Sequence, residues 1–552
     1  MEKHYQKMIK DTQNRVIKSL QIQILDESSP RYGGFADDTG IVHAKYAIYR
    51  VAPMIATYCN PDTVFYKNAL VYERLMLGLD YVKRVQHENG LFDYVTCNFN
   101  SAPDTAFCVK KLLPVYQYLL NKEELTKEEI AIRDKVEHIV HAGALGMLEG
   151  GFHTPNHRWA IASVLMVCAR LFHNEQMRQG AMQYLNEGID CNEDGEFSEK
   201  SAGNYNRINN DAMIMLAEAT GDETYDLYAI KNLYMMLSYW EPDASIFTAN
   251  STRFDKDLLI FPKDYYMEYL KMGMKYQIPE FLQMSNRIFE IVEEKGITSP
   301  DFLIWYMLHP ECRSFEWDGS YPEKDYSVFY KESGIARSRS GRYTVTVMRG
   351  KSNFFYIHNG SVKMEMKVAG SFCEHRAFVS QNMERISQDE YHLSQVMKGW
   401  YYLPFEETPP TSDWWKMDNK ARDMKMGPDV QIDVWVKSVE NGVDVRVKTS
   451  GVEGAPWRIE LAFSGVNFLH NEYVDMPLNG SEVIVVKKGY TEMTNGVDTL
   501  IVGPCFGEHY FTEGKEDSEA KNAGATTLYL TAYTGFDKTI EIRDKLSFYE
   551  KR

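Results

Sequence analysis

The sequence predicts an α+β multidomain protein, in which an N-terminal (α/α) toroid or incomplete barrel precedes a C-terminal antiparallel β-sandwich. The chain has 552 residues, which exceeds the roughly 250–300 at which a single core stops growing. Up to residue 315 apolar residues recur at helical spacing, whereas after it apolar and polar residues alternate. We therefore expect a helical domain over residues 1–315 and a sandwich over residues 316–552, with FEWDGSYPEKDY at the boundary.

Helical segments joined by polar, turn-rich connectors fill the first part of the chain. The sequence predicts helices over residues 64–85, 105–120, 127–148, 159–172, 212–219, 264–276 and 280–294. One face of the fourth helix carries Ile161, Val164, Leu165, Cys168, Leu171 and Phe172. Helices without strands between them favour antiparallel pairs in a toroid or a solenoid. Because no fixed-period repeat is present, we favour the toroid.

Short alternating segments bounded by Gly or Asn fill the second part. They cover residues 342–350, 354–360, 361–370, 430–439, 442–451, 481–489, 527–535 and 538–544. Period-two alternation over many short runs is typical of antiparallel strands with one buried face. The sequence therefore predicts an all-β second domain.

Composition excludes several classes of function. The net charge of −17 argues against a general nucleic-acid or membrane-surface binder. There is no run of about 20 apolar residues and no signal-peptide pattern, so we expect a cytoplasmic protein, although a removed leader would leave the same sequence. Nucleotide-binding motifs are absent, and we expect no cofactor. The eight cysteines show no paired spacing, which indicates free, mostly buried thiols. Aromatic residues at 13% could pack the core or stack on sugar rings.

A helix start at residues 154–158 is a candidate binding site. Thr154 and Pro155 favour a helix N-terminus, which places Asn156, His157 and Arg158 in the first turn. Free backbone N–H groups and the helix dipole favour a bound anion there, and a carboxylate fits. A plain cap with an incidental histidine is the alternative.

The loop DGEFSEKSAGNYNRINND at residues 194–211 is a second candidate. It delivers Asn204, Tyr205, Asn206 and Arg207 to the start of a helix. A solvated connection that merely caps the helix is the alternative. Arg253, together with Asn250, lies on a further loop that could bind sugar hydroxyls or a carboxylate, and Asp104 is expected to cap a helix.

Two histidines are candidates in the second domain. His358 precedes the hairpin signal Asn359-Gly360, and His375 lies in GSFCEHRAF. A metal site is not expected, since neither Cys373 with His375 nor His309 with Cys312 forms a spaced quartet.

Three segments together resemble the heparinase II/III group of polysaccharide lyases and its alginate-lyase relatives. PNH before an apolar helix is similar to the Asn-His motif of that group, and DGEFSEKSAGNYN to its D-G-x-F-x-E-x-S-x-x-Tyr loop, with the tyrosine displaced by about one residue. RGKSNFFYIHNGSVKMEMKVAG resembles the strand pair that usually carries H-x-H-x-D, although only His358 is present here. The group joins a helical toroid to a β-sandwich.

The resemblance implies β-elimination on a uronate-containing oligo- or polysaccharide. Asn156, with His157 or Arg158, would neutralise the uronate carboxylate, and Tyr205 would act as base, acid or both. Arg207 would lower the pKa of Tyr205, and His358 could serve as base for the other substrate epimer, with His375 as its substitute. The residues expected to bind substrate are Arg158, Asn204, Asn206, Arg207, Arg253 and His375. The chain could also form a homo-oligomer.

Two other functions stay open. A glycoside hydrolase on a helical toroid would use paired carboxylates from Asp104, Asp194, Glu199 and Asp211. A non-catalytic carbohydrate-binding protein would keep its sugar binding when Tyr205 and His157 are replaced. An epimerase is a related alternative to the hydrolase.

Overall fold

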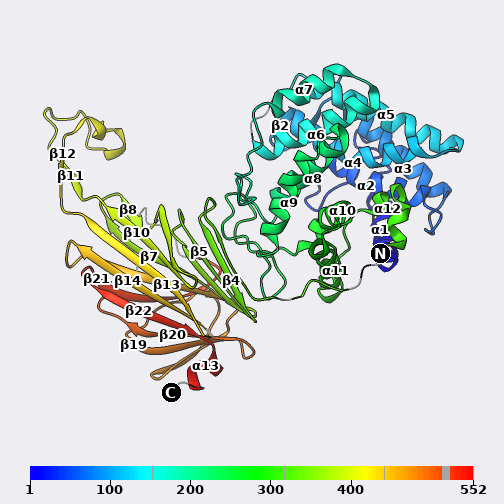
Figure 1. The fold of residues 1–552 in the computed structure, drawn as a ribbon. Helices are drawn as coiled ribbons and strands as arrows, with labels where there is room; N and C mark the ends of the chain where they lie inside the picture. Colours follow the sequence, from blue (N-terminus) through cyan, green and yellow to red (C-terminus); the bar gives the residue numbers. More distant parts are fainter. Residues whose placement is uncertain are drawn as a thin grey trace. The chain divides into compact units, whose positions relative to one another are not determined.

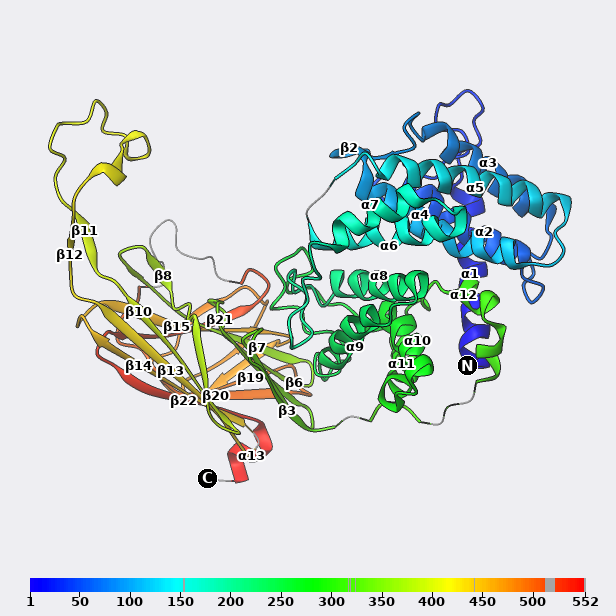
Figure 2. The same cartoon turned by 45° about the horizontal axis from the view of Figure 1, so that its top comes forward.

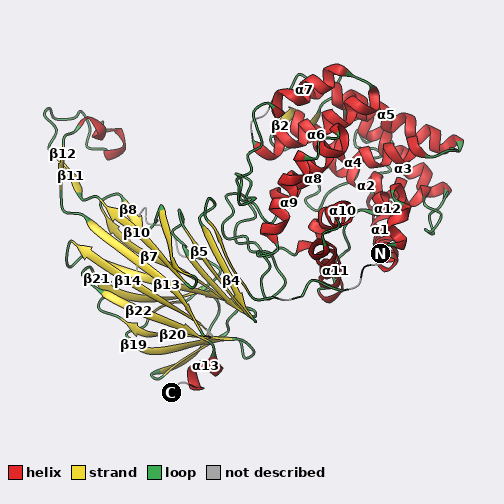
Figure 3. Cartoon of the chain, viewed as in Figure 1, coloured by secondary structure: helices red, strands yellow, loops and turns green. Residues whose placement is uncertain are grey.

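The computed structural model describes residues 1–151, 154–315, 317, 319–322, 324–440, 442–511 and 522–550. The chain divides into two compact units, coloured along the sequence in Figure 1. Unit 1 comprises Met1–Tyr239 and Ile246–Pro322, and unit 2 comprises Trp240–Ser245 and Glu323–Arg552. Helices dominate the first unit and strands the second (Figure 3). The predicted fold class, a helical toroid followed by an antiparallel sandwich, is confirmed.

Unit 1 is built from consecutive helix pairs. Its elements are α1 (Glu2–Ile22), α2 (Ala44–Cys59), α3 (Ala69–Val85), β1 (Phe92–Tyr94), β2 (Asn98–Ser101), α4 (Ala102–Asn121), α5 (Lys127–Met147), α6 (Pro155–Phe172), α7 (Glu175–Leu185), α8 (Tyr205–Thr220), α9 (Thr224–Met236), η1 (Pro262–Tyr265), α10 (Tyr266–Tyr276), α11 (Pro279–Glu294), α12 (Leu303–Leu308) and η2 (Pro310–Ser314). Helices α2, α4, α6, α8 and α10 pack on one another in sequence, and each packs against the odd-numbered helix that follows it. The five helices α2, α4, α6, α8 and α10 thus form an inner layer (Figure 2).

Helix α1 links the two ends of the inner series. It packs on α2, and its His4 ring stacks 4.0 Å from the Phe289 ring of α11. The same imidazole lies 2.9 Å from the hydroxyl of Tyr266, the first residue of α10. These contacts join the first and last helix pairs, as a toroid requires.

Burial distinguishes the inner helices from the outer ones. Every residue of α6 from Trp159 to Ala169 is buried. The sequence predicts one buried face, whereas this part of the helix is buried on all sides. A helix that is apolar all round fits only where neighbours cover every face. At Leu171 and Phe172, by contrast, the predicted face is partly exposed.

Helix α8 begins at Tyr205, seven residues before the predicted apolar segment. Its first turn is polar, yet the Ser201 hydroxyl accepts the Tyr205 N–H at 3.1 Å and the Ser201 carbonyl accepts the Asn206 N–H at 2.9 Å. Further along, the Asn210 side chain donates to Asn232 of α9 at 2.9 Å in the interior. Buried amide pairing lets this polar stretch stay helical.

Unit 2 contains two large sheets. Its elements are β3 (Tyr326–Tyr330), β4 (Ile335–Ser340), β5 (Tyr343–Met348), β6 (Phe355–Asn359), β7 (Val362–Phe372), β8 (His375–Ala377), β9 (Asn382–Ser387), β10 (Glu390–Met397), β11 (Trp400–Tyr402), η3 (Trp414–Lys416), η4 (Asn419–Ala421), β12 (Met424–Met426), β13 (Val430–Val439), β14 (Gly442–Gly451), β15 (Pro456–Ser464), β16 (Phe468–Asn471), β17 (Val474–Pro477), β18 (Val483–Val485), β19 (Lys488–Thr494), β20 (Thr499–Phe506), β21 (Thr526–Tyr533), β22 (Asp537–Arg543) and α13 (Lys545–Glu550).

The sheets face each other across one apolar core. One follows the order β17-β16-β19-β20-β22-β14-β13-β10-β9, and the other β18-β21-β15-β7-β6-β5-β4-β3 with β8 paired to β7. The pairing is antiparallel except between β18 and β21. Alternate residues such as Val443, Val445 and Val447 are fully buried, which is the period-two pattern that predicts the strands.

Buried charged side chains hold the segment Trp240–Ser245 against the strands of unit 2. Glu241 accepts from Arg337 of β4 at 2.8 Å and from Thr344 of β5, and its carboxylate lies 3.0 Å from His358 Nδ1. Burial alone would raise the pKa of Glu241, but the positive charges of His358 and Arg337 hold that pKa well below its ordinary value. An ion-pair cluster therefore holds a segment that interrupts the helical sequence.

We expect Glu241→Gln to lower the free energy of unfolding by about 3 kcal/mol, because it leaves the buried Arg337 charge without its counter-ion. Since the pKa of Glu241 is depressed in the folded state, this stabilisation is present above about pH 4 and is lost as the pH falls below it. Urea denaturation at pH 7 and at lower pH measures both effects. Asp537→Asn, which removes the exposed pair to Arg446, is the control and should change stability far less.

Candidate active site

The N-termini of the inner helices meet at one end of unit 1. Consecutive helices alternate between the inner and the outer layer, so the inner helices run in one direction. Their N-cap residues are His43 for α2, Ser101 for α4, Thr154 for α6 and Asn204 for α8. Lys45 of α2 lies 3.7 Å from Asp104 of α4, which shows that these ends adjoin. Helix dipoles make this end favourable for negative charge.

Asn156, in the first turn of α6, holds a carboxylate that belongs to the chain itself. The backbone N–H of Asn156 donates to Glu199 Oε2 at 3.1 Å, and its side-chain amide donates to Glu199 Oε1 at 2.7 Å. Thr154 provides no side-chain cap. The helix end that the sequence predicts as a carboxylate site thus binds the Glu199 side chain, which is 2% exposed.

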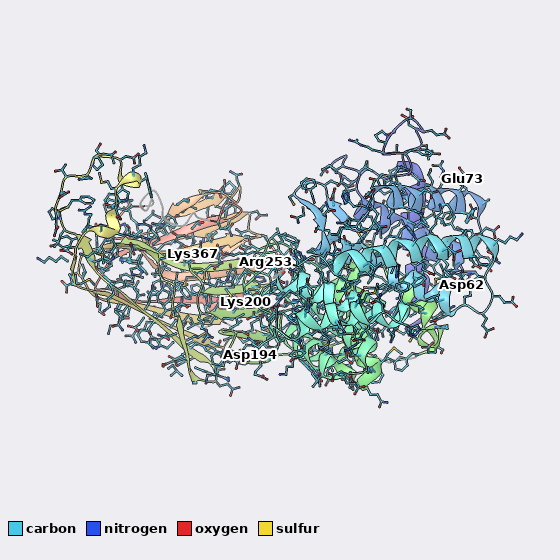
Figure 4. All side chains as sticks on the ribbon, turned by 90° about the horizontal axis from the view of Figure 1, so that it is seen from above. Asp62, Glu73, Asp194, Lys200, Arg253 and Lys367 are labelled. Atoms are coloured by element: carbon cyan, nitrogen blue, oxygen red, sulfur yellow. The ribbon has the colours of Figure 1, made fainter. Side chains whose placement is uncertain are left out.

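Arg253 completes the donor set around Glu199. Its Nε and Nη2 lie 3.0 and 2.9 Å from Glu199 Oε1. The Arg253 side chain is 38% exposed, so part of the guanidinium reaches solvent. Figure 4 labels Arg253 and Lys200, which come from the two loops that meet here. The sequence predicts Arg253 as a substrate-binding residue, and the structure places it beside Asn156 through their shared carboxylate.

Tyr205 is held at the start of α8 by the same pair of loops. Asp255, fully buried, accepts from the Ser201 hydroxyl at 2.7 Å and from the Gly203 N–H at 2.9 Å. Ser201 in turn caps Tyr205. The Tyr205 ring packs edge-on to Phe254, with ring centroids 5.8 Å apart. Within the described parts of the chain, no side chain hydrogen-bonds the Tyr205 hydroxyl.

The environment shifts the pKa values of the two candidate proton carriers in opposite directions. Burial lowers the pKa of His157, Asp104 opposes this change, and the positive Lys45 and Arg253 reinforce it. Burial raises the pKa of Tyr205, the negative Glu199 adds to the rise, and Arg253 opposes it. Both groups are therefore neutral near pH 7.

The predicted influence of Arg207 on Tyr205 is wrong. Arg207 donates to Asn204 at 3.4 Å and lies 3.9 Å from Asp264, and the cation that affects the Tyr205 pKa is Arg253. The reason is geometric, since a residue two positions along a helix points to a different face.

Three further polar residues have structural partners. Arg158 forms an ion pair with Glu187, and its guanidinium carbon lies 4.6 Å from the centroid of the Trp159 ring. Its charge is therefore directed to Glu187 and not to Glu199. Asn206 is 3% exposed and points into the interior. Asn250 is also buried, and its amide donates to Glu196 at 3.0 Å.

His358 and His375 lie in unit 2. His358 is 6% exposed in β6 and belongs to the Glu241 cluster. His375 begins β8 and is half-buried. Their roles in a reaction stay predictions.

The carboxylates considered for a hydrolase are individually engaged. Asp104 accepts from the capping Ser101 hydroxyl at 2.6 Å, Asp211 pairs with Lys110 at 2.7 Å, and Glu199 has the partners described above. Asp194 is partly exposed in the turn before Gly195 (Figure 4). No observation favours two of them as an acid–base pair.

Several side chains near the site carry no clear sequence signal. Lys45 lies 4.8 Å above the Phe107 ring, and the Phe107 and His157 ring centroids are 6.0 Å apart. Tyr94 of the β1–β2 hairpin and Phe254 are exposed. Their only sequence signal is an aromatic residue in a polar connector. They give this end of unit 1 aromatic surfaces of the kind that sugar rings contact.

Other sequence expectations concern cysteines, metals and membranes. All eight cysteines are free and five are buried, as predicted. Across the described ranges, no three His, Cys, Asp or Glu side chains are grouped to hold a metal ion. Of the helices described, none has the length and apolarity to cross a membrane.

We expect Asn250→Ala to lower the free energy of unfolding by about 2 kcal/mol, because Glu196 loses a buried hydrogen-bond donor. Phe254→Ala on the same loop removes a side chain that is 67% exposed, and should change stability by no more than about 0.5 kcal/mol. Thermal and urea unfolding of both variants measures the difference. Equal stability of the two variants would contradict a structural role for Asn250.

No protein-family profile and no curated protein sequence matches the chain. Solved structures do match. The chain is similar to a Paenibacillus xanthan lyase (TM-score 0.59, 10% identity, 98% of this chain and 57% of that one). It is also similar to a Streptomyces coelicolor A3 chondroitin AC lyase (0.55, 11%, 99% and 80%) and to the heparan sulfate lyase HepC from Pedobacter heparinus (0.51, 11%, 97% and 82%).

The chain spans little more than half the length of the xanthan lyase, and identities near 10% compare folds alone. The neighbours nevertheless match along nearly all of this chain, across both units. The chain therefore has the fold of the heparinase-like polysaccharide lyases, the group whose motifs its sequence resembles.

Proposed function

We propose that the chain is a glycan lyase that cleaves a uronate-containing oligo- or polysaccharide by β-elimination at the Asn156–Tyr205 end of unit 1. The observation that carries the proposal is the donor set of Asn156 and Arg253, which already binds one carboxylate, that of Glu199. Similar folds in lyases of xanthan, chondroitin and heparan sulfate support the same class of reaction.

Neutralising the uronate carboxylate is the first requirement of the reaction. Removing the proton on C5 builds negative charge that spreads into the carboxylate, and donors placed there stabilise it. Arg253 has five N–H donors in total and uses Nε and Nη2 for Glu199, so its exposed side keeps donors for a second carboxylate. The backbone and side-chain amides of Asn156 both donate to Glu199, so Arg253 is the group of this pair whose donors reach solvent.

The directions of the two pKa shifts support one division of the proton transfers between His157 and Tyr205. A neutral imidazole can accept a proton, and burial keeps His157 neutral to lower pH than usual. A neutral phenol can donate one, and burial with the Glu199 charge keeps Tyr205 protonated. We therefore assign His157 as the base that removes the C5 proton and Tyr205 as the acid that protonates the departing C4 oxygen.

The steps balance without an added reagent. The C5–H pair of electrons forms the C4–C5 double bond as the C4–O bond breaks. His157 gains a proton and Tyr205 loses one, and transfer between them through solvent restores both. The products are an unsaturated uronate and a chain with a new free hydroxyl. Exposed Phe254 and Tyr94 would contact the apolar faces of the sugars.

We expect Tyr205→Phe to reduce the rate of lyase activity by about 10²–10⁴-fold, because the leaving oxygen loses its acid. The assay follows the ultraviolet absorbance of unsaturated uronate during incubation with chondroitin, heparan sulfate, xanthan and alginate. Tyr234→Phe, a 46% exposed tyrosine of α9, is the control and should retain activity. New reducing ends without the absorbance band would refute elimination and point to the carboxylates of unit 1.

We expect the rise of kcat/KM with pH to occur below pH 6.5, the ordinary pKa of histidine, because the base must be neutral. Lys45→Gln removes a cation and should raise the pKa of His157, moving the rise to higher pH. Asp104→Asn removes an anion and should move it to lower pH. NMR titration of the His157 ring checks both shifts independently of activity. Shifts of the reverse sign would contradict His157 as the base.

A further inference from the structure

A cavity of about 320 Å³ lies on the outer face of one sheet of unit 2, far along the sequence from the residues assigned above. Helix α13 packs on β20 at this place (Figure 1). Strands β16, β19 and β20 form the floor. The lining side chains that argue for a ligand are His470, Glu472, Tyr490, Glu492, Phe548 and Tyr549.

Strand register explains why these side chains share one face. His470 pairs with Glu492, and Glu492 pairs with Ile501, so all three point to the same side of the sheet. Their neighbours Leu469, Met493 and Leu500 point to the apolar core. A register shift between Gly489 and Thr491 interrupts the ladder beside Tyr490, and such bulges redirect side chains.

Two carboxylates line the cavity, one with an ion-pair partner and one exposed. Glu492 is 7% exposed and accepts from Lys545 of α13 at 2.7 Å. The backbone of Gly489 lies against the Glu472 carboxylate, since a methyl group there would come within 2.8 Å of Glu472 Oε1. Lys545 balances the charge of Glu492, so the exposed carboxylate of Glu472 is the group of this pair that would repel a negatively charged ligand, while both carboxylates offer hydrogen-bond acceptors.

Aromatic rings supply the apolar part of the lining. The Tyr490 and Phe548 ring centroids are 4.9 Å apart, and Tyr549 is 56% exposed beside them. A volume near 300 Å³ lies at the lower end of the range for small-molecule sites, and aromatic walls with a few polar groups are typical of them. Rings for C–H faces and carboxylates for hydroxyl groups match a sugar without negative charge.

We propose that this cavity is a second carbohydrate-binding site, which takes an uncharged sugar unit and discriminates against uronates. The site is far along the sequence from the Asn156–Tyr205 end of unit 1. It offers carboxylates to a ligand, whereas that end offers the Arg253 guanidinium. A glycan that contains both kinds of sugar could therefore be held by its neutral units in unit 2. The proposal does not depend on the reaction assigned to unit 1.

Saturation-transfer NMR on the full chain tests the site, with methyl β-D-glucoside, methyl β-D-galactoside and N-acetylglucosamine as probes and glucuronate for comparison. We expect transfer to the C–H protons of at least one neutral probe, and we expect Tyr490→Ala to remove a larger part of that signal than of the glucuronate signal, because glucuronate also has the proposed site in unit 1. Tyr490→Ala should weaken the affinity for that probe about tenfold, through loss of the stacking surface. Tyr401→Ala, a 52% exposed tyrosine of β11 that does not line the cavity, is the matched control.

Glu472→Gln provides a second variant that preserves size. It should enlarge the part of the glucuronate signal that Tyr490→Ala removes, because one repulsive charge is taken from the cavity. Absence of transfer to all neutral probes would overturn the proposal, as would equal binding by Tyr490→Ala and Tyr401→Ala when circular dichroism shows both folded. Tyr205→Phe should leave this binding unchanged, which separates it from the unit 1 site.

Discussion

The contact between Asn156 and Glu199 is the interaction on which the site in unit 1 depends. An inner series of helices that all run one way collects its unpaired N–H groups and positive dipole ends in one place. At α6 the capping side chain of Thr154 makes no bond, and the carboxylate of Glu199 satisfies the helix end instead. One acidic residue thereby connects the start of α6 to the loop that leads into α8.

The rest of the site follows from that connection. Arg253 binds the same carboxylate, and its charge adds to the lowering of the His157 pKa and partly offsets the rise in the Tyr205 pKa. Asp255, two residues along, ties the Arg253 loop to the turn before Tyr205. Two loops distant in sequence are therefore fixed at one helix end, which is the rigidity that the proposed reaction would need.

Hydrophobic periodicity predicts the elements whose burial is regular. It does not predict elements whose conformation depends on hydrogen bonds to residues elsewhere in the chain. Strands β13 and β14 match their predicted ranges because one face of each meets the core. The polar start of α8 was expected to be a loop, since its helix depends on Ser201 and buried amide pairs. Asn156, His157, Tyr205 and Arg253 were identified from local motifs, whereas Lys45 and Phe107 come from α2 and α4, whose proximity to α6 only the fold reveals.

A carboxylate inside a site proposed to bind another carboxylate has a physical use. Glu199 takes the Asn156 donors and balances the charge of Arg253, so an incoming uronate would meet the exposed side of a balanced guanidinium rather than a free cation. An unbalanced cation would bind the ground-state carboxylate strongly, and binding that is equal in ground and transition states does not accelerate a reaction. A balanced site gives its largest stabilisation when charge builds on the substrate during proton removal. In the proposed reaction, the buried Glu199 would thus favour catalysis over tight substrate binding.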